Sequence, residues 1–227
     1  MSDRFSLIYA PVLLGAACAA LRALQSAYGF DGAGLPTGSV FGPASAAFAA
    51  ASAALLLALS RRVRPSGGFF APPPRPWAAV SALGSVLLAL SGIGYILSSF
   101  GGAASAAELL LGVFAVFAAV LAPIARRVGA DGSPVRGRLP FALAPACFCT
   151  AWIVVFYRDH ASDPVLWRYW CPLLAIAALT LSFYYSAGFY CGRAFFRRLA
   201  FFSALAVFLA IAALPGNGFG PIVLCLA

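Results

Sequence analysis

The chain has 227 residues, of which 63% are hydrophobic and 9% are charged, and its mean hydropathy is +0.96. A soluble domain carries about a quarter charged residues, and no soluble fold can hide this much apolar surface. The positive charge comes from arginine alone, since the chain has no lysine. This absence excludes lysine Schiff bases and phosphate-loop lysines. The composition predicts an all-α integral membrane protein that forms a single domain in the lipid bilayer.

Apolar runs, separated by clusters of glycine, proline and arginine, divide the chain into seven predicted transmembrane helices. They cover residues 5–28, 43–60, 77–100, 105–125, 140–157, 164–190 and 199–214. About 20 residues cross the hydrocarbon as a helix, and helices are required because lipid offers no partner to an unpaired backbone group. The remaining residues, 215–227, are too few to span and are expected to fold back as a cap or to lie along the interface.

Arginines gather in the connectors on one side of the predicted bundle. These connectors and the N-terminus hold Arg4, Arg61, Arg62, Arg64, Arg75, Arg126, Arg127, Arg136, Arg138, Arg193, Arg197 and Arg198. The opposite side holds Arg158 and Arg168, with Arg22 close by. Because arginine-rich loops stay in the cytoplasm, the pattern predicts a cytoplasmic N-terminus and a C-terminus outside. Membrane orientation explains the charge better than nucleic-acid binding, and a bacterial cytoplasmic membrane is the expected location.

Small residues recur every fourth position in the first two predicted helices. The stripes are Gly15, Ala19, Ala23 and Ala27, and then Gly42, Ala46, Ala50, Ala54 and Ala58. Such stripes let helix backbones approach closely in a membrane. They indicate either packing within one bundle or a docking face for another subunit.

Glu108 is the only glutamate and stands near the start of the fourth predicted helix. The sequence Ser105-Ala-Ala-Glu108 before an apolar run is typical of a capping box, in which the serine caps the helix and the glutamate binds the backbone N–H of the cap. The carboxylate would also lie at the favourable positive end of the helix dipole. Helix capping is therefore a complete structural explanation of this residue.

A functional site that pairs Glu108 with Arg22 is the rival explanation. Arg22 follows Phe5 by seventeen residues, about 25 Å along a helix, which is the outer third of a hydrocarbon core about 30 Å thick. Glu108 is expected at a similar depth, and an intramembrane charge often marks the path of a substrate or ion. Under this explanation, Arg22 and Glu108 are the predicted ligand-binding residues.

The segment 158–163 holds the only histidine, His160, between two aspartates. A histidine in this setting suggests acid–base or metal chemistry, but no second histidine or glutamate lies nearby. Asp163 followed by proline is also a usual helix start. We therefore expect a solvated loop, and we predict no metal site, no cofactor and no catalytic residue. A disulfide between Cys171 and Cys225, both expected near the outer surface, is left open.

Helix-kinking residues favour a central cavity. Gly92 and Gly94 in the third predicted helix, Pro145 in the fifth and Pro172 in the sixth are the candidates for such kinks. The residues expected to line the cavity are Thr150, Thr180, Ser182 and Tyr184.

Two classes of function follow. The first is a transport-type membrane protein that binds a small apolar or weakly polar molecule near the outer leaflet, with Arg22 and Glu108 at the polar rim. The second is a non-catalytic membrane subunit that docks a membrane protein partner, or a second copy of itself, through its small-residue faces. An enclosed pocket reached by Arg22 favours the first class, and an exposed alanine groove favours the second.

Overall fold

The computed structural model describes residues 2–29, 38, 40–63, 75–100, 105–126, 137, 139–161, 169–191, 193 and 195–215. Within these ranges the chain forms α1 (Ser2–Tyr28), α2 (Phe41–Arg61), α3 (Arg75–Phe100), α4 (Ala106–Arg126), α5 (Leu139–His160), α6 (Trp170–Gly188), the 3-10 helix η3 (Phe189–Cys191) and α7 (Phe196–Ala212). No strand occurs in the described ranges. The predicted all-α class is confirmed for this part of the chain.

Predicted and observed helix ends agree within three residues everywhere except at the start of α6. This helix begins at Trp170 rather than Pro164, and residues 162–168 lie outside the described part. Pro172 therefore stands in the first turn, where its missing N–H costs no hydrogen bond. The expected loop at the histidine was wrong for its first residues, because α5 continues to His160.

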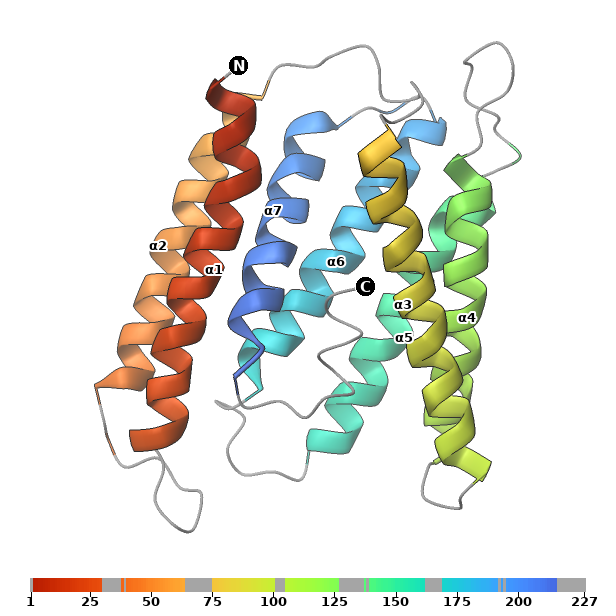
Figure 1. The fold of residues 1–227 in the computed structure, drawn as a ribbon, viewed down its shortest axis with the longest axis horizontal. Coiled ribbons are helices and arrows are strands. Elements are labelled where there is room, and N and C mark those ends of the chain that lie inside the picture. Colours follow the sequence, from red (N-terminus) through yellow and green to blue (C-terminus); the bar gives the residue numbers. More distant parts are fainter. Residues whose placement is uncertain are drawn as a thin grey trace.

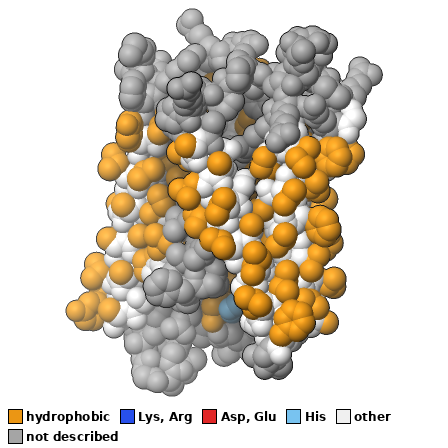
Figure 2. Space-filling view, turned by 45° about the vertical axis from the view of Figure 1, so that its right-hand side comes forward, with side chains coloured by type: hydrophobic (Ala, Val, Ile, Leu, Met, Phe, Trp, Pro, Cys, Tyr) orange, Lys and Arg blue, Asp and Glu red, His pale blue; other side chains and the backbone are white. Residues whose placement is uncertain are grey.

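In the described part of the chain, six helices, α1 to α6, are long and apolar enough to cross a membrane. On the face shown in Figure 2, hydrophobic side chains run along the helices, and no described arginine, aspartate or glutamate side chain is visible. These features indicate an integral membrane protein. The seventh helix, α7, has 17 residues, which makes it about 26 Å long. Its assignment as a seventh span and the orientation of the bundle stay predictions.

The helices stand roughly parallel in an open row (Figure 1). Each of α3 to α6 packs on the next helix in the chain, α7 packs on α1, and α2 packs on both α1 and α7. Helices α1, α3, α5 and α7 begin at the upper end of the bundle in Figure 1, and α2, α4 and α6 begin at the lower end. We use these two names for the ends below.

Two clusters of buried apolar side chains hold the row together. One joins α1, α2, α6 and α7 around Leu56, Cys171 and Phe208. The other joins α4 and α5 to α6 around Leu111, Trp152 and Ile176, and side chains of α3 pack against it. Helix α6 contributes fully buried residues to both clusters, so it connects the two halves of the bundle.

The buried face of α2 differs from the predicted small-residue stripe. It consists of Gly42, Ser45, Ala49, Ser52, Leu56 and Ser60. Only Gly42 belongs to the stripe, whereas Ala50, Ala54 and Ala58 are exposed. In α1, Gly15 packs closely on α7 and Ala23 and Ala27 are exposed. Part of each stripe therefore faces outward.

Candidate functional site

An apolar groove of about 340 Å³ runs between α2, α6 and α7. Its lining consists of Ala46, Ala49, Ala50, Ala53, Trp170, Leu174, Ala177, Ala178, Leu181, Phe202, Leu205, Phe208 and Leu209. The indole N–H of Trp170 is the one polar side-chain group in this lining. The volume lies within the range of small-molecule sites, which is about 300–1,000 Å³.

The groove is elongated and extends over about half of the bundle's height. Trp170, the first residue of α6, marks its lower end, and Leu181 lies about 16 Å further along the same helix. On α7, the lining begins at Phe202, about 9 Å from the upper end of that helix. The shape suits an elongated apolar molecule better than a compact polar one.

Alanines in α2 create the space. Because α2 and α6 both pack on α7, α7 forms the floor and the other two helices form the walls. The wall from α2 presents only alanine to the groove, whereas the opposite wall presents Trp170, Leu174 and Leu181 in addition to two alanines. A wall of single methyl groups facing bulky side chains leaves a hollow that larger residues would fill.

Arg22 lies behind the lower end of the groove, and its side chain is only 7% exposed. Its Nη1 donates a hydrogen bond to the carbonyl oxygen of Ala212 at the end of α7, with a donor–acceptor distance of 3.2 Å. Its guanidinium carbon lies 5.9 Å from the ring centroid of Trp170. The C-terminal carbonyls of a helix carry partial negative charge, and an indole face attracts a cation, so both contacts stabilise the buried charge.

A second polar contact lies one turn from Arg22. Gln25 and Ser45 are both buried, and the Ser45 hydroxyl lies 3.0 Å from Oε1 of Gln25. The same hydroxyl lies 2.8 Å from the carbonyl oxygen of Gly42, so its single hydrogen serves two acceptors. This contact joins α1 to α2 where both helices lie next to α7.

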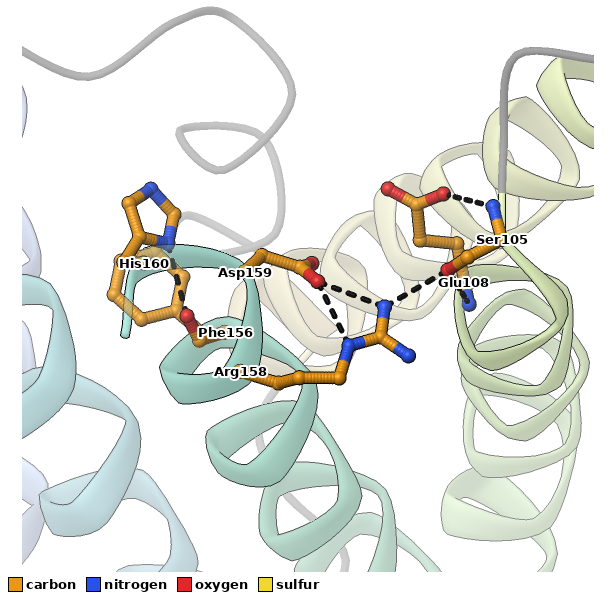
Figure 3. Close-up of polar contacts among 6 residues, drawn as sticks. All are labelled: Ser105, Glu108, Phe156, Arg158, Asp159 and His160. Carbon is orange, nitrogen blue, oxygen red and sulfur yellow. Dashed lines mark hydrogen bonds and ion pairs between the residues drawn. The ribbon is translucent and has the colours of Figure 1, made fainter. Parts of the chain in front are cut away.

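Glu108 forms the predicted capping box at the start of α4 (Figure 3). The backbone N–H of Ser105 donates to Oε2 of Glu108 at 2.6 Å, and the backbone N–H of Glu108 lies 3.4 Å from the hydroxyl oxygen of Ser105. Arg158 at the end of α5 donates to the same hydroxyl at 2.8 Å and forms an ion pair with Asp159 at 2.7 Å. These exposed contacts tie the ends of α4 and α5 together.

His160 belongs to the last turn of α5 and has a structural environment. Its Nδ1 donates to the carbonyl oxygen of Phe156 at 2.8 Å, since a carbonyl can only accept. Its ring stacks on Phe156 with centroids 4.4 Å apart and lies 4.1 Å from the ring of Tyr169. Within the described residues, no three His, Cys, Asp or Glu side chains gather where they would hold a metal ion.

The structure does not bring Arg22 and Glu108 together. Helices α1 and α4 stand at opposite ends of the long axis of the bundle (Figure 1). The contacts of Arg22 reach α6 and α7, and the side chain of Glu108 binds its own helix cap. Equal depth along two helices does not determine which helices are neighbours, and this is why the expected pair does not form.

None of the four residues predicted to line a cavity lines the groove. Thr150 and Thr180 donate to backbone carbonyls four residues earlier, at 2.9 and 2.8 Å. The hydroxyls of Ser182 and Ser203 lie 2.7 Å apart and link α6 to α7, and the Tyr184 side chain is 58% exposed. In an apolar helix, a serine or threonine hydroxyl readily donates a hydrogen bond to a backbone carbonyl of the same helix. The presence of such a residue therefore does not indicate a cavity.

The residues that form the groove were missed because they are all apolar. The available signal was the spacing of alanines 46, 49, 50 and 53, which places them on one face of a helix. The same helix carries alanines on other faces too, so the spacing alone does not identify a groove. Compared with family models, with curated proteins and with solved structures, the chain matches none.

Proposed function

We propose that the protein is a transport-type multi-pass membrane protein that takes a small apolar or weakly polar molecule into the groove between α2, α6 and α7. The arginine distribution favours a topology with the upper end of the bundle in the cytoplasm, and a bacterial cytoplasmic membrane is the proposed location. In that topology, the groove lies mainly in the outer half of the bilayer and extends past its middle.

The observation that carries this proposal is the concave, almost wholly apolar lining of the groove. Its floor and one wall consist of bulky residues such as Phe202, Leu205 and Leu174, which offer contact area to a hydrocarbon chain. Arg22 contributes indirectly in this proposal, because its buried charge contacts the ring of Trp170 at the lower end of the groove. Glu108 has no part in the proposed site.

Photo-crosslinking in lipid vesicles tests the proposal. The purified protein is reconstituted with a hexadecanol that carries a diazirine in its chain, irradiated, digested and mapped by mass spectrometry. Labels are expected on the groove residues of α6 and α7. Ala50→Trp, which fills the α2 wall, should reduce this labelling several-fold, and Ala51→Trp should not, because residue 51 lies about 100° further around the helix.

Equal labelling of groove residues and of the exposed α3 residues Leu83 and Leu97 would contradict a specific site. So would labelling of α6 and α7 that is the same in both tryptophan variants. Either result would mean that the label reports general contact with lipid.

Docking of a partner protein is the second candidate, and the outward-facing alanines of α2 favour it. Ala54 and Ala58 are exposed outside the groove lining, where a second helix could approach closely. Mass measurement in mild detergent tests self-association through this face. Under the docking proposal, the wild-type protein is a dimer or larger and Ala54→Trp yields the monomer. A monomeric wild type excludes association with a second copy.

A further inference from the structure

Arg198 lies on the same face of α7 as the residues that line the groove. It precedes Phe202 by four residues, Phe202 precedes Leu205 by three, and Leu205 precedes Leu209 by four. Residues at these spacings follow one another along a single helix face. The apolar face that forms the floor of the groove therefore continues upward to a guanidinium group.

Aromatic side chains position Arg198 at this end. The ring of Phe202, which lines the groove, stacks on Tyr185 with centroids 5.5 Å and planes 14° apart. The guanidinium carbon of Arg198 lies 5.8 Å from the Tyr185 ring centroid and 5.0 Å from that of Phe195. Both distances lie within cation–π range, so the two rings stabilise the guanidinium at this place, and a guanidinium carries five N–H donors in its plane.

The distances match one leaflet of a bilayer. Along α7, Arg198 lies about 6 Å from Phe202 and about 16 Å from Leu209. Half of a hydrocarbon core is about 15 Å thick. Side chains of a helix lean toward its N-terminus, so Arg198 extends toward the upper end and the interface. From a cation at the interface, the α7 face runs about 16 Å to the last lining residue, which matches a phospholipid headgroup and one acyl chain that reaches past the middle of the bilayer into the groove.

A second arginine stands on the groove side of α2. Leu57 follows the lining residue Ala53 by four residues, and Arg61 follows Leu57 by four more. Both Arg61 and Leu57 are exposed. Arg61 and Arg198 thus place positive charge at the upper end of both helices, and their charge is complementary to an anionic headgroup.

We infer that the groove holds an acyl chain of an anionic phospholipid from the leaflet at the upper end, with the lipid phosphate at Arg198. The inference rests on the proposed function, from which it takes the ligand site and the cytoplasmic position of this end. A guanidinium binds phosphate oxygens through charge-assisted hydrogen bonds, and the cytoplasmic leaflet carries the anionic lipids. A zwitterionic lipid with the same chains has no net charge, so it should bind more weakly.

Native mass spectrometry with defined lipids tests the inference. The delipidated protein in mild detergent is titrated with 1-palmitoyl-2-oleoyl phosphatidylglycerol or with the phosphatidylcholine of the same chains. We expect one tightly held phosphatidylglycerol, with a preference of about tenfold over phosphatidylcholine, because the choline ammonium adds a positive charge next to Arg198 and Arg61 that offsets the attraction of the phosphate. Arg198→Gln should abolish the preference, and Arg198→Lys should retain part of it. Arg197→Gln is the matched control, since Arg197 lies about 100° away around the same helix.

The outcomes separate the two proposals. Equal affinity for the two lipids, or equal loss of preference in the Arg197 and Arg198 variants, overturns the anionic-lipid inference. If Ala50→Trp lowers the affinity for both lipids while Arg198→Gln changes nothing, the groove is a lipid site without a phosphate contact, and the proposed function stands. If Ala50→Trp also leaves lipid binding unchanged, the inference fails and the groove is not the site of the bound lipid.

Discussion

Gly92 of α3 and Gly112 of α4 face each other so closely that a Cβ added to either would lie 2.7 Å from the carbonyl oxygen of the other. Real Cβ atoms do not approach a backbone oxygen to this distance, so the crossing of α3 and α4 requires glycine on both sides. The contact brings two helix backbones together where packing and weak Cα–H···O contacts replace the hydrophobic effect.

Gly112→Ala or Gly92→Ala should therefore destabilise the protein by about 1–3 kcal/mol, the usual cost of overpacking. The change is measured as a lower melting temperature in detergent. Gly94→Ala is the matched control, because nothing lies within 4 Å of a Cβ at Gly94. Equal melting temperatures for the Gly94 and Gly112 variants would contradict the close crossing.

Replacement of Arg22 by methionine should lower stability. Methionine keeps most of the side-chain volume but removes the donor to the carbonyl oxygen of Ala212 and the cation next to Trp170. A buried acceptor that loses its donor costs about 1–3 kcal/mol. Arg62→Met, at an exposed arginine just after α2, should leave the melting temperature unchanged. A stable Arg22→Met variant would show that the buried contacts do not secure the end of α7.

Two buried serines of α2 should respond differently to alanine. Ser45→Ala removes the hydroxyl that contacts Gln25, and its expected cost is about 1 kcal/mol. The Ser52 hydroxyl is buried and has no hydrogen-bond partner among the described residues. Ser52→Ala should therefore leave stability unchanged or raise it, because an unsatisfied polar group is removed. Thermal unfolding of both variants under the same conditions provides the comparison, and a larger loss for Ser52→Ala would refute it.

The capping box predicts how Glu108 tolerates substitution. Glu108→Gln retains an acceptor for the backbone N–H of Ser105, so its stability should match that of the wild type. Glu108→Ala should cost about 1 kcal/mol, as loss of a cap usually does. Neither variant should change diazirine labelling of the groove. If Glu108→Gln alone abolished labelling, the charge would be required, and the functional explanation would replace capping.

Cys191 provides a test of the orientation. It is exposed just before the upper start of α7, in the 3-10 helix next to Arg193. In a Cys147→Ser, Cys225→Ser background, a membrane-impermeant maleimide should modify Cys191 in intact cells only after permeabilisation. The other cysteines, Cys18, Cys149 and Cys171, are buried. Modification of Cys191 without permeabilisation would place the upper end outside and reverse the proposed topology.

The sequence predicted the helices well because each signal was local. Apolar runs and breakers gave the ends of most helices, and the spacing of Ser105 and Glu108 gave the capping box with its donors and acceptors. The site depended on which helices are neighbours, and in a lipid environment every helix is apolar, so hydrophobicity does not select partners. Arg22 binds the end of α7 through a backbone carbonyl, and every residue has such a carbonyl. The identity of the side chains therefore does not predict this contact.

The groove illustrates the same limit. Its α2 wall consists of alanines, and only the packing of α2 on α7 shows which of the many alanines face α6. Arg198 was counted among the cytoplasmic arginines, but its place at the end of the groove follows from the stack of Phe202 on Tyr185. Aromatic contacts between helices depend on the fold and cannot be read from spacing within one helix.

Ile176 belongs to one buried cluster, whereas Cys171, Ala175 and Ala178 of the same helix belong to the other. Within the described chain, α6 is thus the one helix that contributes buried residues to both clusters. The two sets of buried contacts share no other helix, so a change in the packing of α2 on α7 would leave the contacts between α4 and α5 in place. Occupation of the groove by the proposed ligand would therefore affect the packing of one half of the bundle and leave the packing of α3, α4 and α5 unchanged.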